Sequence, residues 1–282
     1  MMRAAALALF LVAACGTDSR APAGGGDDTG GGDDGSGTGG DGGGPVSNAT
    51  GHITSDKTWT GTVHVTGSVI VDAGVTLTIA AGTQVLVKTG ATSITANGTI
   101  DIQGTSASPV TVGPEGSGHW YGFEIPQGGV LTTEYLHQLD GGIHISDTGS
   151  ATILDSTMSH MNGDFLTMSD GTVDVEYSAI GVEPPATDTT HCDMHVEGAP
   201  HIKVTHSNVS TSSYGIMFYG GMGEDFTYDN WFSNANDVDV LPTPVSADFS
   251  HSYFASGQPA NPHGYFTEDD MQSARVTDAG PR

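Results

Sequence analysis

One short segment of the sequence concentrates side chains that could bind a metal. His191, Cys192 and His195 lie in the run His-Cys-Asp-Met-His, and His201 and His206 follow it. Imidazole and sulfur ligands suit zinc or copper, and a soft thiolate favours Cu(I). These five residues are therefore a candidate copper or zinc site, although the fold requires no cofactor. The simpler alternative is that the histidines are solvated surface residues of an acidic protein.

Paired carboxylates are a second group that could do chemistry. Hydrolysis of a neutral glycan needs two carboxyl groups, about 5–5.5 Å apart for retention or about 6.5–9.5 Å apart for inversion. The pairs Asp174/Glu176 and Glu224/Asp225 are the candidates. Residues 46–262 contain 23 acidic side chains, so close pairs are expected by chance. We therefore assign no catalytic residue.

The charge of the chain limits the partners and substrates that it can attract. The sequence has 33 acidic residues against 7 Lys and Arg, which gives a formal net charge of −26. Nucleic acid is excluded as a partner because its phosphates need basic side chains. Only Lys57, Lys88 and Lys203 lie within residues 46–262. An acidic field of this kind repels a polyanionic substrate, which argues against a lyase acting on acidic polysaccharides.

The N-terminal segment, up to Pro45, predicts export and anchoring. Arg3 precedes an apolar run at residues 4–14, which is too short to span a bilayer but fits the apolar region of a signal peptide. The run ends Leu-Val-Ala-Ala-Cys-Gly and resembles a bacterial lipoprotein signal, which implies cleavage after residues 1–14 and a lipid on Cys15. An ordinary signal peptide is the alternative. Residues 15–45 then form the lipidated Cys and a flexible Gly/Asp-rich linker. The expected address is the outer membrane or cell surface, with membrane contact through the lipid only.

From Val46 onward, short apolar segments alternate with Gly, Asn, Asp and Ser, and no stretch keeps a helical period. Short strands are predicted at 69–71, 75–79, 85–87, 100–102 and 110–112. Pairs of apolar residues end at Ile79, Ile102 and Ile125, which are evenly spaced along the chain. Many short strands at a regular spacing indicate a solenoid, a barrel or a sandwich.

A second motif decides in favour of a solenoid. A polar residue, any residue and a large apolar residue recur, with starts at Glu134, Ser156, Ser178, Ser207, Asn230 and Ser252. The starts follow one another at a nearly constant spacing, and the one longer interval contains a Pro-rich insertion at 183–188. A fixed period of this size is typical of stacked coils. We expect an interior apolar ladder of Met158, Ile180, Val209, Phe232 and Phe254. We expect a polar ladder of Ser156, Ser178, Ser207, Asn230 and Ser252.

Coils of about 22 residues without helices predict an all-β parallel β-helix over residues 46–262. The segment at 68–83 is similar to the opening coils of right-handed, pectin-lyase-like β-helix proteins of bacterial surfaces. That resemblance implies a right-handed solenoid and identifies no activity. Residues 263–282 form a polar tail that we expect to cover the last coil at its start and to be loose at its end.

The predicted function is a non-catalytic binding or structural role at the cell envelope, with a glycan or an envelope protein as partner. Trp231 and Tyr253 are expected on adjacent coils, facing outward, where their rings could stack on sugars or pack against a protein. Two alternatives stay open. One is a polysaccharide-active enzyme, more plausibly a neutral-glycan hydrolase than a lyase, and the other is a metal-binding envelope protein.

Overall fold

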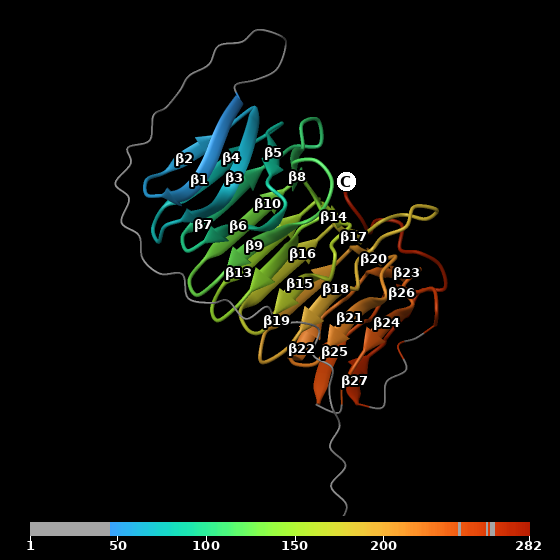
Figure 1. The fold of residues 1–282 in the computed structure, drawn as a ribbon. Coiled ribbons are helices and arrows are strands. Elements are labelled where there is room, and N and C mark those ends of the chain that lie inside the picture. The colour runs from blue at the N-terminus through green and yellow to red at the C-terminus, as the bar shows by residue number, and fades with distance from the viewer. Residues whose placement is uncertain (1–45, 242–243, 258, 260–262) are drawn as a thin grey trace, which may run out of the picture. The chain divides into compact units, whose positions relative to one another are not determined.

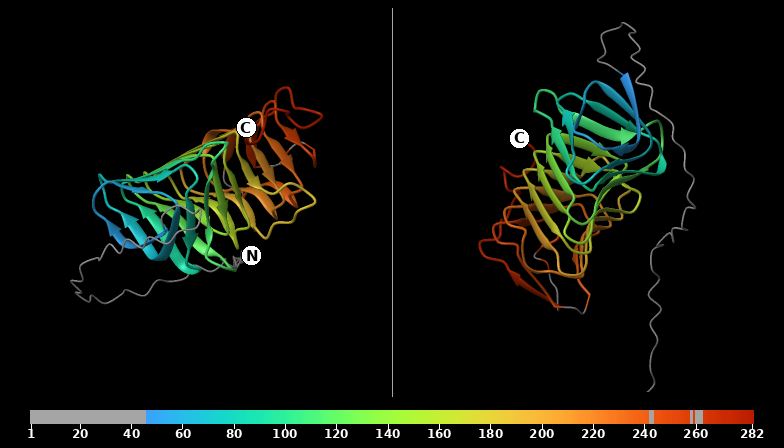
Figure 2. Two further views of the ribbon diagram at one scale, coloured as in Figure 1. Left: turned by 90° about the horizontal axis from the view of Figure 1, so that it is seen from above. Right: turned by 90° about the vertical axis from the view of Figure 1, so that its left-hand side faces the viewer.

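The computed structural model describes residues 46–241, 244–257, 259 and 263–282, and every regular element in it is a β-strand. These residues all belong to one compact unit, Thr38–Arg282. The predicted signal peptide, Cys15 and the linker lie outside the described residues. Figures 1 and 2 show the coils stacked in chain order, from blue to red.

The chain winds through three faces, and each face consists of parallel strands from successive coils (Figure 1). The first face contains β2 (Lys57–Trp59), β4 (Thr76–Ala80), β7 (Thr99–Gln103), β10 (Val130–Glu134), β13 (Ser150–Leu154), β16 (Thr172–Glu176), β19 (His201–Thr205), β22 (Met222–Asp225), β25 (Val245–Asp248) and β27 (Gly264–Thr267). The second face contains the first half of β3 (Thr62–Val71), β5 (Gln84–Val87), β8 (Val110–Pro114), β11 (Leu136–Leu139), β14 (Thr157–Ser159), β17 (Ala179–Gly181), β20 (Asn208–Ser210), β23 (Asn230–Phe232) and β26 (Tyr253–Phe254). The third face contains the second half of β3, β6 (Gly90–Ala96), β9 (Trp120–Ile125), β12 (Gly142–Ile145), β15 (Asp164–Met168), β18 (Cys192–Val196), β21 (Tyr214–Phe218) and β24 (Asn236–Asp239). The strand β1 (Val46–Ile53) pairs with β3 along both halves.

The strand register confirms the predicted parallel β-helix and its repeating coil. Ser150 pairs with Thr172 in the next coil, and Thr172 pairs with His201 in the coil after that. The second of these two steps is the longer one, because it contains the predicted insertion at 183–188. Since the pairing is parallel in each of the three faces, equivalent residues of neighbouring coils stack about 4.8 Å apart.

One predicted series crosses from one face to another. Ile79 and Ile102 are paired neighbours on the first face, as expected, but Ile125 lies in β9 on the third face. The partner of Ile102 in the next coil is Thr133. The coil from Ile102 to Thr133 is longer than the coil from Ile79 to Ile102. Counting the shorter coil length from Ile102 therefore reaches Ile125 on the third face, before the chain has returned to the first face.

The interior apolar ladder on the second face differs from the prediction in one coil. Met158 pairs with Ile180, Ile180 with Val209, and Val209 with Trp231 rather than with Phe232. The Trp231 ring is fully buried and stacks on Phe254 in the next coil, with ring centroids 5.4 Å apart. The predicted alignment is therefore off by one residue at β23.

The turn between the first and second faces is held by a ladder of serine side chains. The hydroxyl of Ser178 accepts the N–H of Ser156 at 3.1 Å, and that of Ser207 accepts the N–H of Ser178 at 3.1 Å. Each hydroxyl also donates to a carbonyl of its own coil, as Ser178 does to Glu176 at 2.9 Å. The fourth position is Asp229, not the predicted Asn230. A buried turn thus satisfies its backbone donors with side chains of the next coil.

The turn between the third and first faces requires glycine. A Cβ atom on Gly129 would collide with the carbonyl oxygen of Ala96 in the preceding coil, and one on Gly149 would collide with that of Ile125. The close approach of backbone to backbone at this corner leaves no room for a side chain.

The tail is bound along its length, so the expectation of a loose end is wrong. The strand β27 extends the first face to Thr267, past the predicted boundary at residue 262. The chain then returns along the outside of the coils (red in Figure 1). The N–H of Gln272 donates to the Ser252 carbonyl at 2.9 Å, that of Val276 to Asn230 Oδ1 at 2.7 Å, and that of Gly280 to the His206 carbonyl at 2.8 Å.

Candidate functional site

Ring-bearing and acidic side chains gather on the outer side of the third face. The parallel register aligns His144 with Thr167, Thr167 with His195, and His195 with Met217. We call the group the histidine–tyrosine patch, and its members are Tyr121, His144, Asp164, His191, His195, Tyr214, Tyr219 and Asp239. The patch spans strands β9 to β24.

Asp164 lies at the centre of the patch between two histidines. Its Oδ1 is 2.8 Å from Nδ1 of His191, and its Oδ2 is 2.8 Å from Nδ1 of His195. Burial alone would raise the pKa of Asp164, but the hydrogen bonds to both imidazoles bring it below its usual range. The hydrogen bond between Asp164 and His195 also raises the pKa of His195. Nε2 of His195 also lies 3.1 Å from Oε1 of Glu197. The centre of the patch is therefore an imidazole–carboxylate cluster.

Tyrosine rings flank this cluster. The rings of His195 and Tyr219 meet edge to face with centroids 5.4 Å apart, and the Tyr219 hydroxyl donates to Asp239 at 2.7 Å. Burial, followed by this hydrogen bond, raises the pKa of Tyr219, so the phenol stays neutral. At the other end, Tyr121 is 42% exposed and packs on His144 with centroids 4.5 Å apart. Burial lowers the pKa of His144. The patch thus offers rings together with polar groups that can donate and accept hydrogen bonds.

The structure brings together two of the five predicted metal ligands. His191 and His195 share Asp164, but the Cys192 side chain is fully buried, with Sγ 2.7 Å from the Met194 carbonyl oxygen. Burial raises the pKa of this thiol, which keeps it protonated. His201 is exposed at the start of β19 on the first face, and His206 lies at the turn between the first and second faces. Copper or zinc binding therefore stays a prediction.

No group of three or more His, Cys, Asp or Glu side chains that could hold a metal ion occurs among the residues that the structure describes. The residue that sequence reasoning missed is Asp164. It pairs across the lengthened coil with Cys192, the residue next to His191. Asp164 could have been identified by counting one regular coil length plus the length of the insertion back from Cys192.

The predicted pair of outward aromatic residues is not formed. Trp231 is fully buried inside the coils, so the prediction that it faces outward is wrong. Tyr253 aligns with Asn230, which occupies the position one residue before Trp231. The alternation of strand side chains explains the error, because a shift of one residue moves a side chain to the other side of the sheet.

A different aromatic group lies at the turn between the first and second faces. The rings of Tyr177, His206, Tyr228 and His251 stack in succession, with centroid distances of 4.9, 4.8 and 4.6 Å. All four residues have positive φ angles, between 46° and 62°. The left-handed backbone directs each side chain outward at the same point of successive coils. His206 and His251 thus lie in one stack of rings, with Tyr228 between them.

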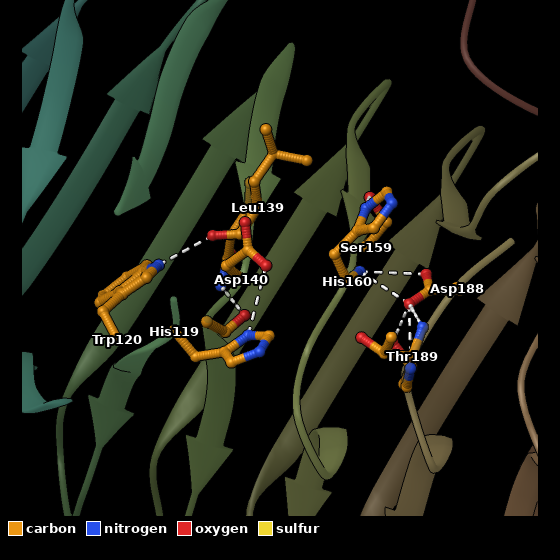
Figure 3. A network of polar contacts seen from close by, with 11 residues as sticks. His119, Trp120, Leu139, Asp140, Ser159, His160, Asp188 and Thr189 are labelled. Atoms are coloured by element: carbon orange, nitrogen blue, oxygen red, sulfur yellow. Dashed lines mark hydrogen bonds and ion pairs between the residues drawn. The ribbon is translucent and has the colours of Figure 1, made fainter. Parts of the chain in front are cut away.

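Histidines and acids also meet at the turn between the second and third faces (Figure 3). Nδ1 of His119 is 3.2 Å from Oδ1 of Asp140. The N–H of His160 donates to both carboxylate oxygens of Asp188 at 3.0 Å, and Oδ1 of Asp188 also accepts the N–H groups of Thr189 and Thr190. Asp188 ends the long insertion, so this network fastens the insertion to the preceding coil.

A shallow cleft of about 600 Å³ lies on the first face, lined by strands β7, β10 and β13 and by the loop after β7. Oδ1 of Asp101 accepts the hydroxyl of Thr132 at 2.8 Å, and its Oδ2 accepts Nε2 of Gln103 at 2.6 Å. Glu134 is the other acidic residue of its lining. The lining mixes polar and apolar side chains, and it includes none of the carboxylate pairs that the sequence suggested.

The carboxylate pairs suggested by the sequence, Asp174/Glu176 and Glu224/Asp225, include residues that bond to the backbone or to a lysine. Oε2 of Glu224 accepts the N–H of Ile202 at 2.6 Å, its Oε1 accepts that of Met222 at 3.0 Å, and burial raises its pKa. Asp174 lies 3.8 Å from the ammonium of Lys203 in the next coil. Both residues therefore stabilise pairing between coils.

The fold and the patch define a parallel β-helix with an outward-facing cluster of rings and carboxylates. Comparison with models of protein families, with curated proteins and with solved structures found no match. Within the described part of the chain, no helix has the length and hydropathy needed to cross a membrane.

Proposed function

We propose that this protein is a lipid-anchored β-helix that binds a glycan at the cell envelope without catalysing a reaction. The observation that carries the proposal is the histidine–tyrosine patch. It combines exposed or half-exposed rings with hydrogen-bonding groups on one face of consecutive coils.

The chemistry of the patch fits a saccharide. The apolar side of a sugar ring packs against a phenol ring, and its hydroxyl groups bond to carboxylates and imidazoles. Tyr121 offers an exposed ring, while Asp164 and Asp239 offer acceptors. The formal charge of −26 favours a neutral or basic glycan over a polyanionic one.

The non-catalytic part of the proposal rests on the contacts of the acidic residues. Asp164 is shared by two histidines and Asp239 accepts a tyrosine hydroxyl, so both carboxylates already serve to position neighbouring rings. Glu224 bonds to backbone N–H groups. These arrangements favour a preformed binding surface, which loses little entropy when a ligand binds.

The proposed address rests on the sequence pattern around Cys15 and on the Gly/Asp-rich linker that follows it. A lipid on Cys15 and a flexible linker up to Pro45 would hold the coils away from the membrane surface. A surface-held binding module of this kind meets envelope polysaccharides or the glycans of another cell.

Glycan binding is tested with the chain from residue 15 onward carrying Cys15→Ser, which removes the proposed site of lipid attachment. Neutral, basic and acidic polysaccharides are compared by calorimetry, alongside a Tyr121→Ala/Tyr219→Ala variant. Each aromatic contact is worth about 0.5–1.5 kcal/mol, so we expect the affinity of the double variant to fall roughly 5- to 150-fold.

The matched control is Tyr265→Ala, because Tyr265 is 70% exposed and lies on the first face, away from the patch. It should bind like the parent chain. Equal losses in both variants, or no binding of any glycan class by the parent chain, would contradict the proposal. Capture of a protein by the parent chain instead would indicate the protein partner.

A further inference from the structure

The column of outward side chains at the turn between the first and second faces contains one side chain that has no ring. In chain order the column reads Tyr135, Asp155, Tyr177, His206, Tyr228 and His251, and every member has a positive φ angle. The Asp155 side chain is only 3% exposed. A nearly buried carboxylate between rings needs a cation to offset its charge.

Arg282 supplies that cation. Its Nε lies 2.9 Å from Oδ1 of Asp155 and its Nη2 lies 2.9 Å from Oδ2, which is the two-pronged geometry of the strongest arginine–carboxylate pairs. The guanidinium carbon is 3.7 Å from the centre of the Tyr177 ring. The planar guanidinium therefore stacks on Tyr177 at the position where a ring is missing from the column.

The second arginine of the tail uses the same combination of contacts. Nη1 of Arg275 lies 3.0 Å from both carboxylate oxygens of Glu183, and its guanidinium carbon is 3.4 Å from the centre of the Phe232 ring. The Glu183 contact is largely exposed, whereas the Asp155 carboxylate is buried under its arginine. The Asp155 position is thus the more completely built of the two arginine sites.

We propose that Asp155 and Tyr177 form an exchangeable arginine-binding site, and that Arg282 from the tail of a second copy of this chain can occupy it. Two chains that exchange tails in this way would make a reciprocal dimer. This goes beyond glycan binding, because the site lies at another corner of the coils and recognises a guanidinium group.

Three observations favour a second copy as the occupant. The site already fits this tail, and exchange between copies reproduces the same contacts. The Arg282 side chain is 52% exposed, so it can leave without opening the coils. Arg275 and Arg282 are the only arginines after Arg20, which makes the tail the only segment of the coils and tail that can supply a guanidinium group.

The test pairs two variants of the mature chain that carry Cys15→Ser. Asp155→Asn removes the carboxylate of the site and leaves the tail intact, whereas Arg282→Gln leaves the site intact and removes its occupant. Neither variant alone can complete the contact. A mixture can complete it only between chains, with Arg282 of one variant on Asp155 of the other.

We expect sedimentation equilibrium to show that the mixture associates at least about tenfold more tightly than either variant alone. Addition of free arginine at high concentration should dissociate the mixed dimer. Replacement of Asp155→Asn by Asp155→Gly as the site-dead partner should give the same result, because glycine also lacks the carboxylate and tolerates the positive φ angle of this position. This second variant keeps the test valid if the first one fails to fold. Arg282→Lys in the tail-bearing partner should weaken association, because lysine cannot bond to both oxygens in one plane.

Equal association in the mixture and in the separate variants would overturn the proposal. Dimers that persist unchanged in all variants would overturn it as well, because they would form without the site. Glycan binding is measured on the same samples. Its loss or retention bears only on the patch, so the two proposals can fail separately.

Discussion

Ser207 donates its backbone N–H to Oδ1 of Asp229 at 2.7 Å, at the point where other coils use a serine hydroxyl. The Asp229 side chain is fully buried, and its Oδ2 has no hydrogen-bond partner in the part of the chain that the structure describes. Burial, which is the largest effect, raises the pKa of Asp229 well above its usual range. One coil of the serine ladder is therefore closed by a group that resists ionisation.

Replacing this residue by the serine of the other coils should stabilise the protein. Because the pKa of Asp229 is raised in the folded state, folding retains a proton that the unfolded chain loses above about pH 4. Stability falls as the pH rises from that value through the folded pKa. We expect Asp229→Ser to be more stable than the parent at pH 7 by about 1–3 kcal/mol, and by less at pH 4. Urea unfolding at the two pH values measures the difference.

The matched control reverses the change. Ser178 occupies the same position two coils earlier, with its hydroxyl bonded to Ser156 and to the Glu176 carbonyl. Ser178→Asp should destabilise the protein at pH 7 and recover part of the loss at pH 4. Destabilisation by Asp229→Ser at pH 7 would contradict this account of the turn.

Charge placed inside the coils should be far more harmful than charge placed outside. Ile180 is 1% exposed between Met158 and Val209, whereas Thr172 is exposed at the start of β16. Ile180→Asp should cost about 3–5 kcal/mol, because an unpaired charge is buried, and Thr172→Asp should change stability by less than about 0.5 kcal/mol. Denaturant unfolding of the two variants measures this. Similar costs for both would show that inside and outside are assigned wrongly.

The period of the fold could be predicted from the sequence because each buried turn needs a polar side chain that accepts its backbone N–H group. Ser156, Ser178 and Ser207 marked that turn once in each coil. The alignment failed at Asp229 because the adjacent Asn230 is polar too, and either residue fits the pattern. That shift of one residue placed Trp231 outside although it is fully buried.

The pairing of Asp164 with His195 should stabilise the protein within a limited pH range. The raised pKa of His195 gives stability that is present below about pH 6.5 and lost as the pH rises through the folded value. The lowered pKa of Asp164 gives stability that is present above about pH 4 and lost as the pH falls through its folded value. We expect His195→Gln to cost most between about pH 4 and 6.5, with an effect of up to about 1 kcal/mol, because the pair is partly exposed.

A double-mutant cycle checks the source of that effect. The pH-dependent cost of His195→Gln should disappear in an Asp164→Asn background, since the partner of the imidazole is then neutral. Unfolding free energies at several pH values give the coupling. A cost that keeps its pH dependence in the Asp164→Asn background would assign it to Glu197, which lies 3.1 Å from Nε2.

Lipid attachment should depend on the first cysteine only. Cys15→Ala should move the protein from the detergent phase to the aqueous phase in a phase-partition assay, because the anchor is lost. Cys192→Ser is the control, and it should partition like the parent because the Cys192 side chain is buried within the coils. Unchanged partitioning of Cys15→Ala would contradict the lipoprotein prediction.

The candidate site was only partly predictable. The cluster of His191 and His195 stood out in the sequence, but Cys192 was grouped with them because neighbours along a chain look like neighbours in space. In β18 the side chains alternate, so the thiol points inward while the imidazole of His195 points outward. Asp164 and the bound tail depend on contacts between distant segments. Arg282 reaches Asp155 from the far end of the chain, a pairing that local patterns do not record.

The bound tail also changes how the coils can come apart. Coils that touch only their neighbours open one at a time from an exposed end. The tail joins Ser252, Asn230, His206 and Asp155, so these coils can fray only after it detaches. The C-terminal half should therefore exchange its amide hydrogens as one cooperative block, whereas protection should rise gradually from the N-terminal end inward.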